Sequence, residues 1–243
     1  MKQGIDTVVE NLPLTRDVWQ MRLAGDTSAF TAPGQFAALR LEGFFLRRPI
    51  SICDWDGNGM TLLYKVVGHG TDAMTRLEPG AAVDILTGLG HGYDLAPSGP
   101  SPLLVGGGVG VPPLYGLCRR LLAQGKAPRV LLGFNTASEV FYADAFQALG
   151  VPVQVSTVDG SHGTTGFVSD LMQGLSYDYF YACGPMPMFR AIEAVAATSG
   201  QYSLEERMGC GFGACMGCTI KTRLGPKRVC KDGPVFHREE VLF

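Results

Sequence analysis

The sequence has no long hydrophobic run and no excess of charge of one sign. Its 243 residues include 20 Lys and Arg against 22 Asp and Glu, and the net charge of −2 gives no electrostatic basis for binding nucleic acid or an anionic membrane. No apolar stretch approaches the roughly 20 residues that span a bilayer. The first residues, MKQGIDTVVENLPL, also lack the basic start and apolar stretch of a secretory signal. We therefore expect a cytoplasmic protein that binds neither nucleic acid nor a membrane.

Disorder is excluded as well, because 46% of the residues are hydrophobic and only 17% are charged. What the chain has in abundance is glycine, 33 residues, well above the usual share of about 7%. Glycine allows tight turns and close approach of the backbone to a ligand. The chain also has seven cysteines, which in a cytoplasmic protein favour a metal or redox site over disulfides.

Three segments differ in their patterns. Residues 1–98 contain short apolar runs between Gly, Pro and Asp turns, which predicts a small antiparallel β barrel. A proline-rich linker at 96–102 leads into 99–202, where alternating strands and helices predict an α/β domain with a parallel sheet. Residues 203–243 are rich in Cys and Gly and too few for a core without a metal. The α/β segment has expected strands at 103–110, 129–134, 151–157 and 177–184, and expected helices at 114–124, 140–149 and 186–198.

Four cysteines near the C-terminus have the spacing C-x4-C-x2-C-x11-C. The first three match the plant-type ligand spacing of a [2Fe–2S] cluster, and the intervening glycines suit a loop whose N–H groups surround electron-rich sulfur. The alternative is a structural zinc site, but zinc modules usually pair two C-x2-C motifs and this chain has one. The pattern therefore favours an iron–sulfur cluster on Cys210, Cys215, Cys218 and Cys230.

The expected barrel carries a short motif suited to a dinucleotide, Arg48-Pro49-Ile50-Ser51. A guanidinium can clamp a pyrophosphate through two hydrogen bonds, and the Ser51 hydroxyl can reach the reactive edge of an isoalloxazine. The segments 63–65 and 68–71 supply a strand and a turn whose backbone can meet the same phosphates. The alternative is an ordinary surface arginine beside a proline turn. The motif gains weight because a nucleotide-binding pattern follows it.

That pattern is the strand–turn–helix VGGGVGVPP at 105–113. Its glycines allow a phosphate to approach the backbone at the start of a helix, although the stretch does not match the G-x-G-x-x-G fingerprint and a tight structural turn is the alternative. A second turn, Cys183-Gly184-Pro185, ends an expected strand where α/β sheets bind ligands, here a nicotinamide. Its alternative is a helix start with proline in the first turn. The nucleotide candidates in the first turn are Gly106, Gly107, Gly108 and Gly110.

Taken in order, these motifs resemble those of the ferredoxin-reductase superfamily. The C-terminal cysteines and the stretch VDGSHGTTGFVSD (158–170) narrow the resemblance, over essentially the whole chain, to the electron-transfer subunits of class 1B dihydroorotate dehydrogenases of pyrimidine biosynthesis. In that family NADH reduces FAD, the FAD passes single electrons to the cluster, and the cluster supplies FMN in a separate catalytic subunit where dihydroorotate is oxidised to orotate. The resemblance implies FAD binding by Arg48, Pro49, Ile50, Ser51, Leu63, Tyr64, Lys65, Gly70 and Thr71.

The resemblance also implies an NAD coenzyme, an FMN-containing partner in a heterotetramer of two of each subunit, and no catalytic residue for dihydroorotate on this chain. One departure is Ile50, where the wider superfamily often has an aromatic residue. The stretch 133–141 has Glu139 and no basic residue, which favours NADH over NADPH. Phe212 and Met216 are candidates for the partner surface, unless they pack inward.

Two other functions remain open from the sequence. The first is a subunit of another flavin and iron–sulfur complex, such as an NADH-dependent ferredoxin:NADP oxidoreductase, a sulfide dehydrogenase or a hydrogenase diaphorase. The second is a zinc-stapled nucleotide-binding module.

Overall fold

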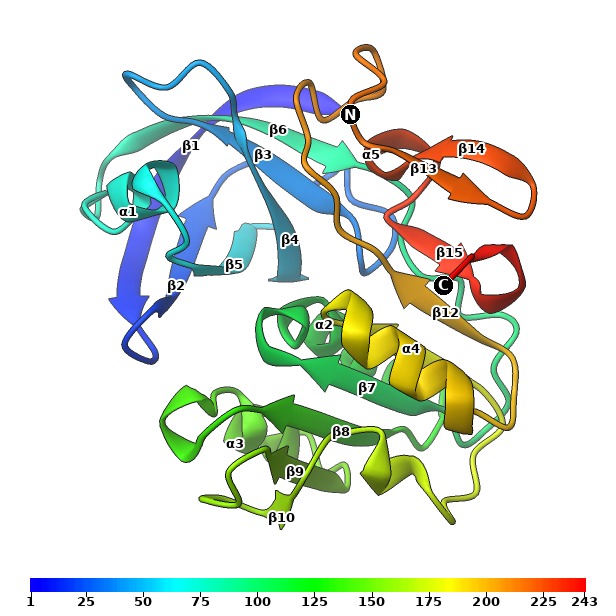
Figure 1. Ribbon diagram of the computed structural model, residues 1–243. Helices are drawn as coiled ribbons and strands as arrows, with labels where there is room; N and C mark the ends of the chain where they lie inside the picture. The colour runs from blue at the N-terminus through cyan, green and yellow to red at the C-terminus, as the bar shows by residue number, and fades with distance from the viewer.

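The structure, a computed structural model, describes residues 1–243. Its first half is a closed antiparallel barrel with the strand order β1-β2-β5-β4-β3-β6 (Figure 1). One short helix, α1 (His69–Met74), lies between β5 and β6. The barrel strands are β1 (Lys2–Pro13), β2 (Val18–Ala24), β3 (Phe36–Arg40), β4 (Arg48–Trp55), β5 (Gly59–Lys65) and β6 (Ala82–Leu89).

Apolar side chains fill the barrel because they alternate along its strands. In β2, Val18, Met21 and Leu23 are buried, and Arg22 between them is exposed. Met21 and Leu23 belong, with residues of β3, β4, β5 and β6, to a core of 14 buried side chains, whereas Val18 packs in the core shared with the sheet domain. Strand β1 differs, since only Asp6 and Val8 of its twelve residues are buried. It is held by backbone pairing with β2 on one side and β6 on the other.

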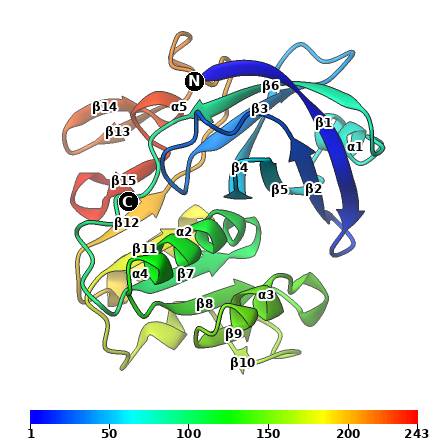
Figure 2. The ribbon, with the colours of Figure 1, turned by 180° about the vertical axis from the view of Figure 1, so that it is seen from behind.

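The second half is built on a seven-stranded sheet with the order β10-β9-β8-β7-β11-β12-β15. All its neighbours pair in parallel except β12 and β15, which are antiparallel. Helix α4 lies on one face, and α2 and α3 lie on the other (Figures 1 and 2). The strands are β7 (Leu103–Gly107), β8 (Arg129–Phe134), β9 (Val153–Thr157), β10 (Thr164–Thr165), β11 (Phe180–Cys183), β12 (Gly200–Ser203) and β15 (Val235–His237). The helices are α2 (Pro112–Ala123), α3 (Ala143–Ala148) and α4 (Met186–Val195), with short 3-10 turns at Gly108–Gly110, Ala137–Glu139 and Asp170–Met172. The barrel and the mainly parallel sheet confirm the expected fold class.

The barrel and the sheet domain share a core. Val18, Cys53 and Leu63 of the barrel belong to the same buried cluster as residues of α2, β7 and β8. Helix α2 passes so close to β4 that a side chain at Gly116 would lie 2.6 Å from the carbonyl oxygen of Cys53. Arg119 of α2 forms an ion pair with Asp54 beside this contact. The barrel and the sheet domain are therefore packed directly against each other.

The C-terminal segment is joined to both halves. It contains the hairpin β13 (Thr219–Thr222) and β14 (Gly225–Arg228), helix α5 (Val229–Asp232), strand β15 and a final 3-10 turn at Arg238–Glu240. Strand β15 completes the edge of the sheet, and Cys218 and Cys230 are buried in a cluster with Phe36 of the barrel. The division into 1–98, 99–202 and 203–243 stays a prediction. No helix combines the length and apolar character needed to cross a membrane.

Candidate cofactor sites

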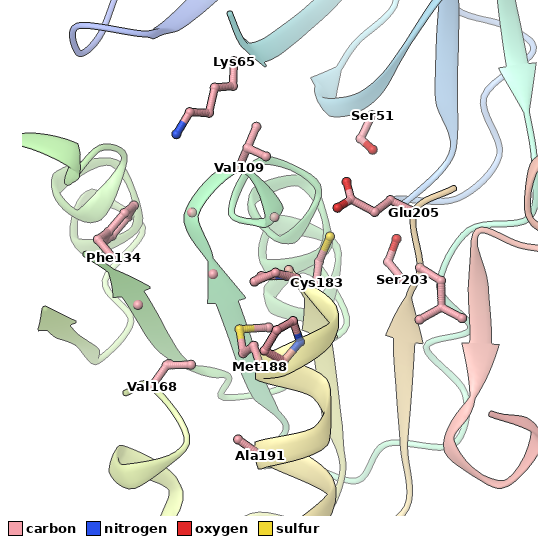
Figure 3. Close-up of a pocket in the computed structure, with 18 of the residues that line it drawn as sticks. Ser51, Lys65, Val109, Phe134, Val168, Cys183, Met188, Ala191, Ser203 and Glu205 are labelled. Carbon is pink, nitrogen blue, oxygen red and sulfur yellow. The ribbon is translucent and has the colours of Figure 1, made fainter. Parts of the chain in front are cut away.

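A cavity of about 710 Å³ lies between the barrel and the carboxyl ends of the central strands. Open α/β sheets bind ligands at this edge because the loops that follow the strands meet there. Figure 3 shows Ser51 and Lys65 of the barrel on one side of the cavity and Cys183, Ser203 and Glu205 on another. Nine of the sequence-predicted residues line it: Pro49, Ser51, Lys65, Gly107, Gly108, Gly110, Cys183, Gly184 and Pro185.

The glycine-rich turn after β7 has two physical reasons for its composition. A side chain at Gly110 would lie 2.2 Å from the carbonyl oxygen of Cys183, so this glycine lets the turn pack against the end of β11. A side chain at Gly107 would meet the Met188 sulfur at 2.5 Å. Gly108 is different, since its φ of +50° is left-handed and no atom lies within 4 Å of where a side chain would begin. Only Gly108 thus leaves open space for a ligand; Gly106 is buried within β7 and packs near Val111.

Arg48 lies at the start of β4 beside the cavity residues Pro49 and Ser51, but does not itself line the cavity. Its guanidinium carbon stacks 4.7 Å from the centre of the Phe44 ring, and its Nη1 donates to the carbonyl of Leu46. The guanidinium also passes directly over Gly70, where a side chain would lie 1.8 Å from Nε. Gly70 therefore leaves room for the arginine to cross the turn in this position, and the guanidinium places a positive charge at the rim of the barrel.

The other barrel candidates have different surroundings. Thr71 accepts hydrogen bonds from the N–H groups of Val67 and Gly68, at 2.9 and 3.2 Å, and so fixes the turn that precedes α1. Leu63 is buried in the shared core, and Tyr64 donates to Asn11 Oδ1 at 2.9 Å inside the barrel. The side chains of Leu63, Tyr64 and Ile50 are not among the residues that line the cavity.

Cys183 is a half-buried thiol at the end of β11. It lies in contact with the hydroxyls of Ser203 and Tyr93, and burial raises its pKa to about 12. A thiol with such a pKa stays protonated at neutral pH and is a poor nucleophile. The Cys183 thiol can therefore pack against a ring in the cavity or form a hydrogen bond with it, as a neutral group.

Sequence reasoning missed the wall of the cavity that follows β12, which contains Ser203, Leu204, Glu205, Glu206 and Met208. The signal available was weak, because Gly200–Ser203 is short and mostly polar although all four residues are buried. Once this stretch is recognised as a strand, its carboxyl end must face the same edge as those of β7 and β11. The cluster cysteines begin two residues after Met208.

The four cluster cysteines lie as two pairs. Cys210 and Cys215 are neighbours, with the Cys210 N–H 3.5 Å from the Cys215 sulfur, and Cys230 donates its N–H to the Cys218 sulfur at 3.4 Å. One zinc needs four ligands around one point, whereas a two-iron cluster takes two thiolates on each iron. The pairing fits the second arrangement.

Backbone N–H groups surround the first pair, as expected for a loop that wraps sulfur. Ala214 and Cys215 donate to the Cys210 sulfur at 3.2 and 3.5 Å, and Gly217 donates to the Cys215 sulfur at 3.4 Å. Burial acts to raise the pKa of Cys210, but these donors outweigh it and lower the pKa to about 6. In the second pair, burial and the neighbouring Cys218 raise the pKa of Cys230 to about 12. Cys210 is thus prepared for the thiolate form, whereas Cys230 needs a metal to ionise it.

A dinucleotide-sized cavity bounded by an antiparallel barrel and a mainly parallel sheet defines a reductase of the ferredoxin-reductase fold, here with a cysteine module beside the cavity. Solved structures agree. One titled as an NADH-dependent reduced ferredoxin-NADP oxidoreductase has a TM-score of 0.88 and 27% identity, covering 98% of this chain and 90% of that one. A ferredoxin NADP+ reductase from Neisseria gonorrhoeae, with bound FAD and NADP, has a TM-score of 0.69 at 15% identity, covering 81% and 92%, and supports the fold alone.

Sequence comparison narrows the class. Residues 205–242 match the family described as the iron-sulfur cluster binding domain of dihydroorotate dehydrogenase B. The chain is 45% identical over 97% of both lengths to a protein of Bacillus mycoides named "Dihydroorotate dehydrogenase B (NAD(+)), electron transfer subunit", and 43% identical over the full length of both to one of the same name from a Geobacillus. The chain belongs to this family of dihydroorotate dehydrogenase B electron transfer subunits, which confirms the resemblance seen in its motifs.

Proposed function

We propose that this chain carries electrons between a nicotinamide coenzyme and a separate FMN-containing subunit that oxidises dihydroorotate to orotate in pyrimidine biosynthesis. Its resident cofactors are FAD and a [2Fe–2S] cluster. FAD, when bound, exchanges two electrons with the nicotinamide and one at a time with the cluster. The reaction belongs to an oxidoreductase complex, and the dihydroorotate chemistry belongs to the partner.

The direction of flow follows from the electron balance. Oxidation of dihydroorotate releases two electrons, and the names of the Bacillus and Geobacillus relatives give NAD(+) as the acceptor. In the biosynthetic direction the electrons therefore enter this chain from the catalytic subunit and leave it on NAD+. This is the reverse of the order expected from the resemblance, in which NADH reduces the flavin.

One observation supports the proposal most directly. The segment 203–210 is a single stretch that begins at the cavity wall with Ser203, lines it as far as Met208, and reaches the first cluster ligand, Cys210. A cofactor in the cavity and a cluster on the cysteines would therefore be neighbours. Electron transfer requires that closeness, whereas a zinc staple has no reason to adjoin a nucleotide cavity.

The residues have separate roles in this proposal. Arg48 holds the pyrophosphate of FAD, beside the turn that Gly70 and Thr71 shape. The Ser51 hydroxyl points into the cavity (Figure 3), where it can meet the flavin ring. The backbone of Leu63–Lys65 borders the same cofactor. On the sheet side Gly108 gives the nucleotide room, and Cys183, Gly184 and Pro185 border the nicotinamide. Two cysteine pairs hold the cluster.

The proposed setting is the cytoplasm, in a heterotetramer with two copies of each subunit. All seven cysteines are free of disulfides, as in proteins kept in a reducing compartment.

The test is to purify the chain alone and together with an FMN-bearing catalytic subunit. Alone it should contain FAD, iron and acid-labile sulfide and reduce an artificial dye with NADH, with no turnover of dihydroorotate. With the partner it should link dihydroorotate oxidation to NAD+. Turnover of dihydroorotate by the isolated chain, or zinc without sulfide, would contradict the proposal.

A further inference from the structure

An ion pair flanks Cys230 in the cysteine module. Arg228 ends β14, and Asp232 ends α5, the helix that carries Cys230. The backbone N–H of Arg228 donates to Asp232 Oδ2 at 2.7 Å, and its Nε donates to the same oxygen at 3.2 Å. Both side chains are about one quarter exposed, 23% and 27%, so the pair is only partly screened by solvent.

The same arginine reaches the loop that holds the other two cysteines. Its Nη1 donates to the carbonyl oxygen of Gly213 at 2.8 Å, and Gly213 lies between Cys210 and Cys215. Gly213 has a left-handed φ of +92°, and the stem of Lys231 packs against it so closely that a side chain there would lie 2.6 Å from the Lys231 Cδ. Arg228 therefore links the exposed cysteine pair to the helix that carries Cys230.

The arginine also acts on the cysteines through its charge. Arg228 is two residues from Cys230, and its Nη1 lies on Gly213, two residues from Cys215, so the guanidinium is held between the two cysteine pairs. Reduction of a cluster adds one negative charge. A nearby cation favours the reduced form and a nearby carboxylate opposes it, and net charge is one of the factors that set cluster potentials.

We propose that the Arg228–Asp232 pair positions the cluster loop and sets the reduction potential of the cluster by the balance of its two charges. This inference rests on the proposed function, because it requires a [2Fe–2S] cluster on the four cysteines. Arg228 acts here by holding the loop of Cys210 and Cys215 and by its electric field at the cluster. It is a positioning residue and contacts no substrate.

The two charges make opposite predictions. Arg228→Gln removes the cation and should make the cluster harder to reduce. Asp232→Asn leaves the cation uncompensated and should make it easier to reduce. Each should change the ratio of reduced to oxidised cluster at a fixed potential by about three- to tenfold, where tenfold corresponds to about 59 mV for one electron. The double variant should return close to the wild-type value.

The measurement is a redox titration of the full chain with its cluster, followed by electron paramagnetic resonance of the reduced cluster. Arg223→Gln is the matched control. It removes one cation from the same module, but Arg223 is exposed at the hairpin tip, three ladder pairs from Arg228, or roughly 10 Å along the strand. It should leave the potential nearly unchanged. Arg228→Lys keeps the charge and loses the two-armed contact, so it should keep the potential and retain less cluster.

Opposite shifts for Arg228→Gln and Asp232→Asn support the inference. The inference is overturned if both variants shift the potential in the same direction, because loosening of the loop would affect both variants alike. It is also overturned if neither shift exceeds that of the Arg223→Gln control. If Arg228→Gln retains too little cluster to titrate, Asp232→Asn and Arg228→Lys decide. A cluster that is easier to reduce in Asp232→Asn, with an unchanged potential in Arg228→Lys, supports the inference, and an unchanged potential in Asp232→Asn overturns it. Absence of iron and sulfide from the wild type would instead refute the proposed function, so the two failures are distinguishable.

Discussion

Replacing Arg48 by alanine tests the flavin site most directly. Two contacts already restrain the guanidinium before any ligand arrives, because it stacks on Phe44 and donates to the Leu46 carbonyl. Little side-chain entropy is then lost when it contacts a pyrophosphate. Loss of a charge-assisted hydrogen bond costs about 1.5–3 kcal/mol. The dissociation constant of FAD should therefore rise roughly 10- to 150-fold at 25 °C.

The assay is titration of apoprotein with FAD, followed by the change in flavin fluorescence. Arg40→Ala is the matched control, since Arg40 is another cation of the barrel. The Arg40 side chain is 69% exposed, and its nearest ion-pair distance, to Asp84, is a long 3.8 Å. It should change the dissociation constant less than twofold. Arg48→Lys should lie between wild type and alanine, because the charge is kept and the fork is lost. Equal affinity of the Arg48→Ala and wild-type proteins for FAD would refute the reasoning.

The remaining predictions concern the cluster, the coenzyme, stability and the partner. Cys215→Ser should lower iron and sulfide content severalfold, whereas a Cys118→Ser variant, at a buried cysteine outside the module, should keep both. NADH should reduce the flavin faster than NADPH in stopped-flow mixing, because Glu139 lies at the cavity and repels a 2′-phosphate; faster reduction by NADPH would contradict this. Burial and Asp26 raise the pKa of Asp6 to about 6, so folding stability should fall as pH rises from about 4 to above 6. The fall in the free energy of unfolding should be at most about 3 kcal/mol in denaturant melts, and Asp6→Asn should remove it. If the Asp6→Asn variant shows the same dependence of stability on pH as the wild type, Asp6 is not the cause. Phe212 and Met216 are 46% and 54% exposed, so Phe212→Ser should weaken partner binding in calorimetry without loss of cluster.

The sheet was predictable from sequence because its strands are apolar runs between glycines and helices. The expected strand at 129–134 has the same bounds as β8, and the expected helices at 114–124 and 186–198 differ from α2 and α4 by only a few residues. The expected helix at 140–149 begins later, at Ala143, since Tyr142 before it has a left-handed φ of 65° and hydrogen-bonds Gln20 of the barrel. That contact joins residues 122 positions apart, which no local pattern reveals.

Strand β1 could not be predicted from an apolar pattern, because it lacks one. Ten of its twelve residues are not buried, and its stability comes from backbone hydrogen bonds to two neighbours. Strand β12 presents the opposite case, since its polar residues are buried between β11 and a strand, β15, that comes from the cysteine module. Both depend on pairing between distant segments.

The glycines of the turn after β7 show how one motif can have two causes. The sequence suggested that all of them make room for a phosphate. A side chain at Gly110, however, would collide with the backbone of Cys183, and one at Gly107 would press on the side chain of Met188. Only Gly108 faces open space. The motif nevertheless predicted the correct loop. The same packing that places this loop at the carboxyl edge of the sheet also forms the cavity there. A glycine-to-alanine change at 110 should therefore disturb folding and nucleotide binding together, while one at 108, strained at φ +50° but unobstructed, should act mainly on binding.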